Sequence, residues 1–465
     1  MTKYEPSTIA AISTPPGTGG IGIIKISGPL SITAAHTIFK STNAGLLNSP
    51  KFLHRKIYFG YIVEPESNRI LDEAILFIMK SPHSYTCEDV VEIQLHSSPI
   101  IMSVILDLLL TMGIRLAEPG EFTKRAFLNG RIDLIQAESI IDLIESQTKT
   151  AGLISAALLK GELGHIFHCL KSELIDFLSL IEASIDFPDE NLDIPSSDSL
   201  INTLNRIINE HISRLVANYT EKHHLRDGIN IVIAGGPNVG KSSLMNCILK
   251  KEKSIVTPVP GTTRDIIDDT IILNGTHVVI SDTAGIHQTN DLIERIGVEK
   301  AKLHIQNADI VLLVIDISKD TPILNHRIYT SIIDKQVILV LNKIDLVDEP
   351  YTYDFSIFKK GIQHVFVSAK NNQGIPELKN IISNLFSFDI KHSESQLIPT
   401  IRQKNALDFI QNNLYAAIKS IADSFPLELV AIDIKACIEK IGEITGDNTP
   451  IDILDTIFNN FCIGK

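Results

Sequence analysis

Three kinds of hydrophobic pattern follow one another along the chain. Up to about residue 120, short runs of alternating apolar and polar residues are punctuated by Gly and Pro, which predicts an α+β domain. From about Ile132 to His224 the apolar residues recur at helical spacing, so we expect long packed helices there. Helical spacing returns at about Ile401, after a polar stretch at 391–396, and continues to the C-terminus.

Between the two helical stretches, short β-branched runs alternate with helical ones. The expected strands are Asn230–Ala234, Val278–Ser281, Asp309–Asp316, Gln336–Leu341 and His364–Val367. Such alternation favours a doubly wound α/β domain with a mostly parallel sheet. The pair Asn274-Gly275 joins two β-type runs in the way that tight hairpins prefer, and it predicts one antiparallel edge strand.

These patterns indicate that one helical domain is interrupted by an inserted α/β domain. A length of 465 residues by itself suggests about three domains. We predict an N-terminal α+β domain at 1–120, the first part of an α-helical central domain at 121–227, the inserted α/β domain at 228–386, and the second helical part at 387–465. The expected fold class is therefore multidomain.

The charge balance limits how nucleic acid can be held. The chain carries 42 Lys and Arg against 55 Asp and Glu, a net charge of −13. An acidic chain cannot hold RNA or DNA by overall attraction, so a nucleic-acid partner would need a local basic patch. The candidate clusters, for which ordinary solvated surface is the alternative, are Lys51, His54, Arg55 and Lys56, and separately Lys124, Arg125 and Arg131.

Cysteine usage and the apolar stretches bear on the compartment. The five cysteines are scattered, without a C-x-x-C pair that would suggest a zinc or disulfide framework, which favours a reducing cytosol. The first residues lack the basic and apolar regions of an export signal. The most apolar long stretch, Pro99–Ile114, is interrupted by polar residues and predicts no membrane span. We therefore expect a cytoplasmic protein.

A phosphate-binding loop begins the inserted domain. Residues 235–242, Gly-Gly-Pro-Asn-Val-Gly-Lys-Ser, fit the pattern G-x-x-x-x-G-K-[ST] between a β-type run and a helical run. In such a loop the glycine N–H groups surround phosphate oxygens. Lys241 neutralises the β- and γ-phosphates, and the Ser242 hydroxyl binds Mg²⁺. A chance Gly-rich turn is the alternative interpretation.

Three further elements follow in the order that a GTPase needs. Asp282-Thr283-Ala284-Gly285 follows a strand, which suits an Asp near Mg²⁺ and a Gly N–H at the γ-phosphate. Asn342-Lys343-Ile344-Asp345 ends another strand, and its Asp carboxylate can accept both the N1–H and the 2-amino group of guanine, a donor pair that adenine lacks. Ser368-Ala369-Lys370 completes a base-binding loop. The set predicts GTP as the nucleotide.

The residue that orients the attacking water is less evident. Ile286 stands where Ras-like proteins place a Gln, and an apolar side chain cannot orient water. Thr263, within 261–265, is a candidate switch threonine for Mg²⁺. Asn238 is a candidate ligand of a monovalent cation that supplies the charge of an arginine finger, and a simple turn residue is the alternative for it.

At this point the residues resemble a known family, the tRNA uridine-5-carboxymethylaminomethyl modification GTPases (MnmE/TrmE), over essentially the whole chain. Beyond the GTPase motifs, three stretches carry the resemblance. They are Thr14-Pro15-Pro16-Gly17 with Gly19-Gly20-Ile21-Gly22-Ile23, Pro119-Gly120-Glu121-Phe122 with Arg125-Ala126-Phe127-Leu128-Asn129, and the terminal Phe461-Cys462-Ile463-Gly464-Lys465.

The resemblance implies a homodimer that forms a heterotetramer with a flavin (FAD)-dependent partner protein. Together they would add a carboxymethylaminomethyl-type group to C5 of the wobble uridine of certain tRNAs. The carbon would come from a tetrahydrofolate such as 5-formyltetrahydrofolate, and GTP hydrolysis would drive the process. The resemblance also implies activation by K⁺ and by contact between the two G domains.

The resemblance carries over to the nucleotide site residue by residue. It implies K⁺ ligands at Asn238, Thr257, Val259 and Thr262, Mg²⁺ ligands at Ser242 and Thr263, and a catalytic pair of Lys241 and Glu294. Glu294 would orient the water indirectly, although a solvated helix face is its ordinary interpretation from the sequence. The expected GTP-binding residues are Asn238, Val239, Gly240, Lys241, Ser242, Ser243, Thr257, Pro258, Val259, Pro260, Gly261, Thr262, Thr263, Asp282, Thr283, Ala284, Gly285, Asn342, Lys343, Asp345, Ser368, Ala369 and Lys370.

The N-terminal part resembles the folate-binding and dimerising domain of the family. Gly17, Gly19 and Gly22 spell the dinucleotide pattern G-x-G-x-x-G, but that fingerprint opens a helix, whereas Ile21–Ser27 alternates like a strand. We therefore reject a dinucleotide site.

The resemblance implies folate contacts at Lys25, Glu92, Arg131 and Lys465. A carboxylate such as Glu92 can accept from the pterin amino group and ring N–H, while basic residues suit the glutamate tail or the formyl oxygen. The family more often has Arg at position 25 and Lys at position 131, so the bidentate geometry can differ here. It also places Cys462 at the modification site, as a nucleophile or as a structural residue, and a small buried thiol is the alternative.

A second hypothesis belongs to another class of protein. A GTP-switched RNA-binding or ribosome-assembly module would share the GTPase motifs without covalent RNA chemistry. Such a module needs a basic RNA-binding appendage. The stretch 433–465 is instead mostly apolar and acidic, which favours the enzyme hypothesis.

Overall fold

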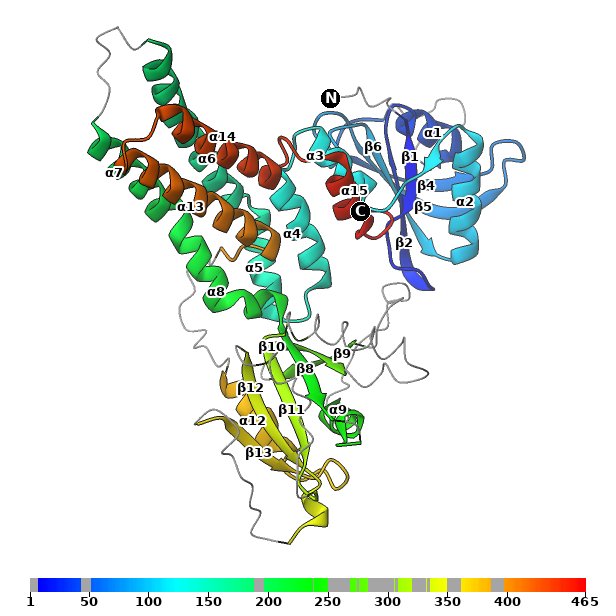
Figure 1. Ribbon diagram of the computed structural model, residues 1–465. Coiled ribbons are helices and arrows are strands. Elements are labelled where there is room, and N and C mark those ends of the chain that lie inside the picture. The colour runs from blue at the N-terminus through cyan, green and yellow to red at the C-terminus, as the bar shows by residue number, and fades with distance from the viewer. Residues whose placement is uncertain are drawn as a thin grey trace, which may run out of the picture. The chain divides into compact units, whose positions relative to one another are not determined.

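The computed structural model describes residues 7–42, 52–187, 196–236, 238–249, 268–273, 276–282, 305, 308–319, 332, 335–348, 361–385 and 397–465 (Figure 1). The chain divides into two compact units. The first consists of residues 1–145, 155–216 and 401–465, and the second of 146–154 and 217–400.

A mixed sheet forms the N-terminal part of the first unit. Its order is β3-β4-β5-β6-β2-β1-β7, and all neighbours are antiparallel except β1 and β7. The strands are β1 (Ile9–Ile12), β2 (Gly19–Ser27), β3 (Phe39–Ser41), β4 (Lys56–Val63), β5 (Ile70–Met79), β6 (Val90–Ser97) and β7 (Arg115–Leu116). Because Gly19 and Gly22 lie within β2 itself, the Gly-rich stretch opens a strand and no helix, which confirms the rejection of a dinucleotide fingerprint.

The two faces of this sheet have different roles. On one face, Ile24, Ile26 and Ile93 are buried in a core with α1 (Ser31–Ile38) and α2 (Pro99–Thr111). Side chains alternate along a strand, so Lys25 and Glu92 belong to the other face. A smaller cluster there includes Ile9, Phe122 and Tyr85, and Phe122 lies on α3 (Glu121–Leu128).

Long helices complete the first unit. In α6 (Glu162–Asp186) the buried residues Phe167, Leu170, Leu174, Phe177 and Ile181 recur every three or four positions and form one apolar stripe. This stripe packs on α14, which in turn packs on α13, and α13 packs on α7. The other elements are α4 (Leu134–Glu145), α7 (Ser197–Ile207), the π-helix η1 (Ile208–Ser213), α13 (Ile401–Ala422), α14 (Leu427–Thr445) and α15 (Ile451–Asn459).

The second unit contains a six-stranded sheet of order β13-β12-β11-β8-β10-β9. Only β9 runs antiparallel to its neighbour, so it is the expected antiparallel edge strand, although the turn at 274–275 lies outside the described residues. Apolar cores cover both faces of the sheet, which is why β11 and β12 are almost continuously apolar. The elements are β8 (Ile229–Gly235), β9 (Asp268–Leu273), β10 (Thr276–Asp282), β11 (Ile310–Asp316), β12 (Gln336–Asn342), β13 (Gln363–Val367), α9 (Lys241–Leu249), α12 (Ile375–Leu385) and the 3₁₀ turn η3 (Ile344–Leu346), together with two helices that are shared with the first unit, α5 (Lys149–Leu159) and α8 (Arg214–Asp227).

The predicted fold class is confirmed: an α+β N-terminal part, a helical part and an inserted α/β part follow one another as the patterns indicated. All five expected strands of the inserted part are present, and α13 begins at Ile401. The boundaries at residues 120, 227 and 386 stay predictions. Among the described residues, every helix is too short or too polar to cross a membrane.

Candidate functional site

The phosphate-binding loop lies where the inserted sheet passes into a helix, between β8 and α9. Two glycines bring its backbone close to neighbouring strands. A Cβ at Gly235 would lie 2.4 Å from the Val314 carbonyl oxygen, and one at Gly240 would lie 2.3 Å from Asn342 Nδ2. Both also have positive φ, of 152° and 100°, which side chains other than hydrogen rarely allow.

Lys241 opens α9 and is buried. Its Nζ donates to the carbonyl oxygens of Gly235 at 3.1 Å and Gly236 at 2.8 Å, so the ammonium group is directed into the loop that precedes it. Ser242 and Ser243 follow on the first turn of the helix and are exposed. This arrangement presents a cation, hydroxyls and a helix N-terminus together, which is the chemistry that phosphate and Mg²⁺ require.

Asn342 connects the phosphate loop to the base-binding loop. Its Nδ2 donates to the Val239 carbonyl at 2.8 Å, and its Oδ1 accepts from the Ala369 N–H at 3.0 Å. Nearby, Ser368 Oγ donates to Asp345 Oδ1 at 2.6 Å, which orients the carboxylate that we expect to read guanine. Three motifs that are far apart in the sequence thus form one hydrogen-bonded group.

Lys343 adds a second connection. It has a left-handed backbone (φ 70°), and its Nζ donates to the Asn238 carbonyl at 2.8 Å and to Asp316 Oδ2 at 2.6 Å. Asp316 ends β11, is 4% exposed, and also accepts from the Ser318 hydroxyl at 2.6 Å. Burial by itself would raise the pKa of Asp316, but the bonds from Lys343 and Ser318 outweigh it and lower that pKa.

Sequence reasoning did not single out Asp316 or Cys247. The Cys247 thiol, on α9, donates a hydrogen bond to the Ala369 carbonyl at 2.8 Å and so connects α9 to the base-binding loop. The one available signal for Asp316 was an acid at the end of an otherwise apolar strand. Cys247 offered none, because an isolated cysteine within a helix is common.

Part of the predicted nucleotide site falls outside the described residues. This applies to Thr283, Ala284, Gly285 and Glu294, and to the side chain of Asp282, whose backbone ends β10. It also applies to the whole expected switch segment, Thr257, Pro258, Val259, Pro260, Gly261, Thr262 and Thr263. The predicted residues that the structure describes are Asn238, Val239, Gly240, Lys241, Ser242, Ser243, Asn342, Lys343, Asp345, Ser368, Ala369 and Lys370.

The second candidate site lies on the N-terminal sheet. Lys25 on β2 stands directly opposite Glu92 on β6, and Lys25 Nζ lies 3.9 Å from Glu92 Oε1. Burial lowers the pKa of Lys25; Glu92 opposes this shift, and the charge of Lys465 adds to it. Two of the four predicted folate residues are therefore a pair, and a third is close enough to act on them.

Aromatic rings complete this site, and the motifs did not assign them. Lys25 Nζ lies 5.4 Å from the ring centroids of both Tyr85 and Phe122. Arg131 Cζ lies 4.7 Å from the Tyr85 ring, and its Nη1 donates to the Tyr85 carbonyl at 3.1 Å. Two cations of the predicted set, Lys25 and Arg131, therefore lie near the Tyr85 ring, and Lys25 is also close to Glu92 and Lys465.

The C-terminal tail returns to this sheet (Figure 1). Ser13 Oγ donates to the Gly464 carbonyl at 3.1 Å, and the Phe122 N–H donates to the Lys465 carbonyl at 3.1 Å. Cys462 is exposed in this tail, and its carbonyl accepts from the Gly120 N–H at 3.5 Å. An exposed thiol agrees better with a role at the surface than with the alternative of a buried packing residue.

The predicted basic cluster around Lys124 needs a correction. Arg125 is 2% exposed and is ion-paired with Glu88 and Glu121, so it holds the domain together and is not available to RNA. Lys124 is paired with Asp455 at 2.6 Å. In the other cluster, Lys51 lies outside the described residues.

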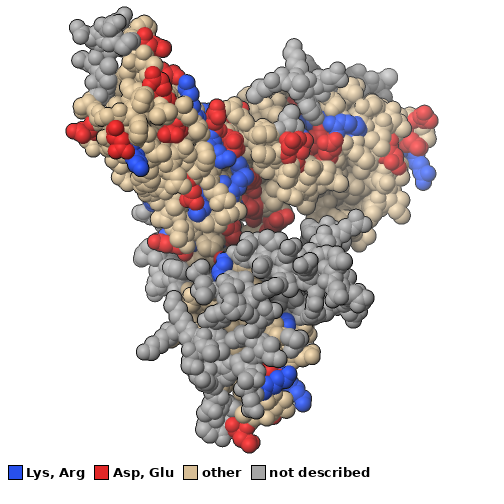
Figure 2. Space-filling model, viewed as in Figure 1, with Lys and Arg blue, Asp and Glu red and all other residues tan. Residues whose placement is uncertain are grey.

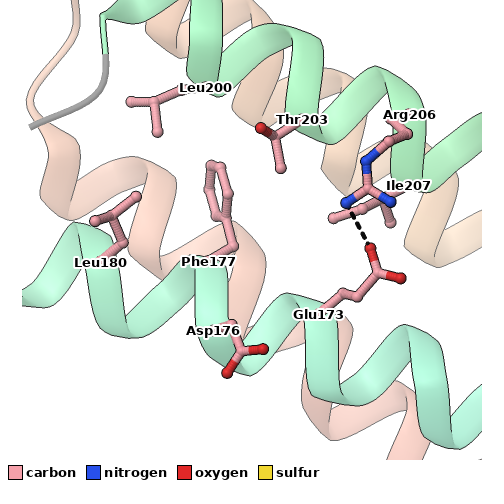
Figure 3. A pocket seen from close by; sticks show the side chains of 8 residues that line it. All are labelled: Glu173, Asp176, Phe177, Leu180, Leu200, Thr203, Arg206 and Ile207. Atoms are coloured by element: carbon pink, nitrogen blue, oxygen red, sulfur yellow. Dashed lines mark hydrogen bonds and ion pairs between the residues drawn. The ribbon is translucent and has the colours of Figure 1, made fainter.

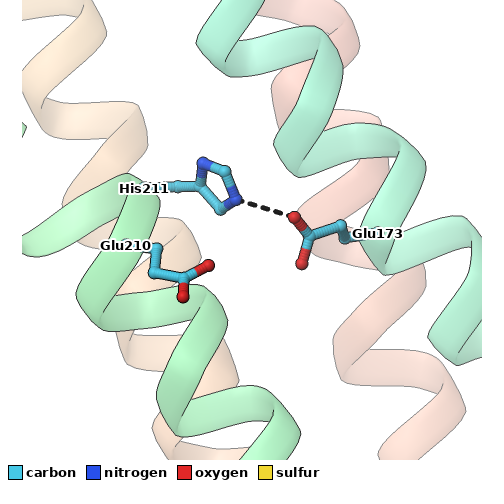
Figure 4. A group of neighbouring side chains, drawn as sticks. All are labelled: Glu173, Glu210 and His211. Carbon is cyan, nitrogen blue, oxygen red and sulfur yellow. Dashed lines mark hydrogen bonds and ion pairs between the residues drawn. The ribbon is translucent and has the colours of Figure 1, made fainter.

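The helical part contains a shallow cavity of about 260 Å³ between α6 and α7 (Figure 3). At its edge, Glu173, Glu210 and His211 place their ligand-type atoms within 4.8 Å of one another (Figure 4). Arg206 donates to both carboxylates, at 2.8 and 2.9 Å, and His211 Nε2 lies 2.9 Å from Glu173. Since a guanidinium already bridges the acids, we interpret the group as an ion-pair network between helices.

Comparisons with known proteins show which family the chain is similar to. Residues 8–131 match a family model described as the GTP-binding protein TrmE N-terminus, and residues 134–462 match one described as the MnmE helical domain. The tRNA modification GTPase MnmE of Carboxydothermus hydrogenoformans is 43% identical over 461 residues, covering 98% of this chain and 99% of the relative. That of Acetivibrio thermocellus is 42% identical over 463 residues, covering 99% and 100%. Among solved structures, the G domain of the T. maritima FeoB iron transporter is 26% identical, covering 34% of this chain and 99% of that one, with a TM-score of 0.25.

Proposed function

Because the chain belongs to the MnmE family of tRNA modification GTPases, and is thereby a GTP hydrolase that acts in tRNA modification, we propose that its K⁺-activated GTP hydrolysis drives a folate-dependent modification of the wobble uridine. A carboxymethylaminomethyl-type group would be added at C5 of that uridine in certain tRNAs. The reaction would need a flavin-dependent partner protein, in a heterotetramer with a homodimer of this chain. We place the process in the cytoplasm.

One observation supports the nucleotide assignment above all others. Asn342 and Lys343 of the base-recognition motif bond to carbonyl oxygens of the phosphate loop, while Ser368 bonds to the Asp345 carboxylate. The phosphate site and the base site are therefore held in one arrangement. Asp345 offers two oxygens to guanine, and one of them already accepts from Ser368, which fixes the direction of the carboxylate.

We propose the same metal-binding residues that the sequence analysis predicted. Mg²⁺ would bind the Ser242 hydroxyl and Thr263, and K⁺ would bind Asn238, Thr257, Val259 and Thr262. Asn238 suits this task because its backbone carbonyl is engaged by Lys343 and its side chain is exposed, so the amide oxygen is the ligand that it offers. When bound, the two cations would neutralise charge that develops on the phosphates, and Glu294 would help to orient the attacking water.

The K⁺ assignment is tested by GTP hydrolysis in K⁺ and in Na⁺ at matched ionic strength. We expect the wild-type rate to fall at least about tenfold in Na⁺, because the positive charge at the phosphates is lost. The Asn238→Ala variant should be slow in both salts. Asn246→Ala, an exposed asparagine on α9, is the matched control and should keep the K⁺ dependence. Equal wild-type rates in both salts would refute the cation role.

We propose that a tetrahydrofolate binds at Lys25, Glu92, Arg131 and Lys465. The pairing of Lys25 with Glu92, the stacking of Arg131 on Tyr85 and the approach of Lys465 support this set. Glu92 would accept from the pterin amino group and ring N–H, and the aromatic ring of Tyr85 offers a flat surface to the ligand. Cys462, exposed near this set, would act at the modification site as a nucleophile or as a shaping residue.

The whole reaction is tested in cells with and without this protein. We expect the modified wobble nucleoside to disappear from the tRNA when the protein is absent, because the tetrahydrofolate bound to this protein would be the source of the one-carbon unit. A Glu92→Ala variant should hydrolyse GTP normally and fail to restore the nucleoside. Unchanged nucleosides in the deletion strain would favour a GTP-switched RNA-binding module instead.

A further inference from the structure

A cavity of about 580 Å³ opens beside the Lys25–Glu92 pair in the N-terminal part. Its size lies within the range of small-molecule sites, about 300–1,000 Å³. The motifs give no role to most of its lining residues, which are Arg55, Phe77, Met79, Pro82, His83, Ser84, Tyr85, Cys87 and Arg131.

The lining is cationic on a chain that is acidic overall. Arg55, Arg131 and the His83 imidazole contribute basic groups, and none of the described residues that line the cavity is Asp or Glu. Burial and the charges of Arg55, His83 and Lys80 lower the pKa of the adjacent His54, which agrees with a local excess of positive charge. Basic side chains therefore surround this cavity although the net charge of the chain is −13, and this local charge favours an anionic ligand.

Strand register makes the cavity continuous with the proposed folate site. Phe77 on β5 stands opposite Glu92 on β6, which stands opposite Lys25 on β2, so the three residues form one row across the sheet. Met79, two residues beyond Phe77, belongs to the same face. The floor of the cavity is therefore the same sheet face that carries the Lys25–Glu92 pair.

Tyr85 is shared by both sites. Its ring contacts Lys25 Nζ at 5.4 Å and Arg131 Cζ at 4.7 Å, and both Tyr85 and Arg131 line the cavity. A folate could place its pterin at Glu92 and the carboxylate of its first glutamate at Arg131. Any further glutamates would then extend into the cavity. The next basic groups along that course are His83 and Arg55.

We propose that this cavity binds the γ-linked oligoglutamate tail of the tetrahydrofolate, with Arg55 and His83 taking the carboxylates beyond the first glutamate. The inference rests on the proposed folate function. Each added glutamate brings one more carboxylate and two methylenes, which match the Arg55 guanidinium and the N–H donor of the His83 imidazole set among Phe77, Met79 and Tyr85. RNA would instead need an extended basic stripe along its backbone, whereas these cations converge on a single hollow.

The test compares binding of mono- and triglutamyl 5-formyltetrahydrofolate to the full chain by calorimetry. Two exposed contacts between carboxylates and basic side chains should make the triglutamyl form bind about two- to thirtyfold more tightly. In Arg55→Ala this advantage should shrink by at least half on a logarithmic scale, while the monoglutamyl affinity stays at the wild-type value. Lys56→Ala, which removes a neighbouring exposed charge outside the lining, should keep the full advantage.

The remaining outcomes separate the two proposals. If the monoglutamyl form binds and the extra glutamates add nothing, the tail site is overturned and the folate function stands. If neither form binds, both are overturned. A loss of tRNA affinity in Arg55→Ala without any change in the folate ratio would assign the cavity to RNA phosphate and overturn the tail site. Monoglutamyl binding at the wild-type affinity shows that the N-terminal part of each variant is folded, and GTP hydrolysis at the wild-type rate shows the same for the second unit.

Discussion

Asp316 belongs to none of the motifs, yet it holds the lysine of the base-recognition motif against the phosphate loop. Cys247 donates to the Ala369 carbonyl in the same way, and the Tyr85 ring lies near both Lys25 and Arg131 at the other site. In each case the motif residue has the right chemistry, and a neighbour outside the motif gives it one position. At the residue scale, the function therefore depends on side chains that hold the motif residues in place.

Replacing Asp316 by Asn tests this dependence on the nucleotide side. The change keeps the shape of the side chain but leaves the Lys343 ammonium without its carboxylate. Breaking a buried ion pair costs several kcal/mol of folding free energy. Lys343 is 29% exposed and keeps its bond to the Asn238 carbonyl, so we expect the variant to lose only about 1–3 kcal/mol of stability in this loop and to bind GDP roughly tenfold more weakly. Asp348→Asn, the same change at an exposed position, should bind GDP as wild type does. Unchanged affinity in Asp316→Asn would show that Asp316 only fills space.

The pKa values of two adjacent histidines on α8 are shifted in opposite directions from the ordinary value. A hydrogen bond to Asp309, at 3.4 Å, raises the pKa of His223. Burial, helped by the charge of His223, lowers the pKa of His224 from 6.5 to about 4. Between those two values the unfolded chain binds a proton at His224 that the folded chain does not, so stability falls as the pH drops through this window, by at most about 3 kcal/mol.

Carbon-13 labelling of the histidine rings allows this to be measured by NMR. The resonance that disappears in His224→Gln should titrate near pH 4, well below the resonance of His223. A His224 midpoint near 6.5 would mean that its ring is hydrated in solution.

At the element scale, most of the structure follows from local pattern. Helical spacing predicted α4 and α13, and the β-branched runs predicted the five strands of the inserted sheet, because backbone period and side-chain burial are coupled. Local pattern did not predict the docking of the C-terminal tail. Gly464 has φ 94°, and a Cβ there would lie 2.5 Å from the Ile12 carbonyl oxygen. The close approach of the tail to β1 therefore requires glycine at this position.

A Gly464→Ala variant should loosen this tail. The added methyl group collides with β1, which would displace Lys465 from the neighbourhood of Lys25 and weaken binding of 5-formyltetrahydrofolate by about five- to thirtyfold. Gly113 is a matched control because its φ is also positive, at 81°, and nothing lies within 4 Å of an added Cβ. Gly113→Ala should therefore bind folate normally, and GTP hydrolysis should be unchanged in both variants. Normal folate affinity in Gly464→Ala would exclude a role for the docked tail.

At the scale of the whole molecule, charge sets how RNA can be held. Lys and Arg are interspersed with Asp and Glu over the helical part in Figure 2, and the net charge is −13. Arg125 and Lys124, once candidates for an RNA patch, are used in ion pairs within the fold. A chain of this kind makes few phosphate contacts and repels the rest of the nucleic acid.

We therefore expect the chain alone to bind tRNA weakly. Fluorescence anisotropy with labelled tRNA should give a dissociation constant of about a micromolar or weaker at about 200 mM salt, and binding should weaken further as the salt concentration rises because phosphate contacts release counterions. If the proposed flavin-dependent partner supplies the missing contacts, adding it should tighten binding. Nanomolar binding by the isolated chain at that salt concentration would contradict the charge argument.

The sequence by itself determined the order of the domains, the strands of the inserted sheet, the phosphate loop, the guanine-reading motif and the family, because each of these is written in neighbouring residues or in a backbone period. Only the tertiary structure decided which side chains meet. Register across β5, β6 and β2 sets Phe77, Glu92 and Lys25 in one row, and the return of the tail brings Gly464 to Ser13. Asp316 and Lys343 likewise pair only because β11 and β12 lie side by side. Such meetings depend on how distant segments close over a common core, and no local pattern contains that information.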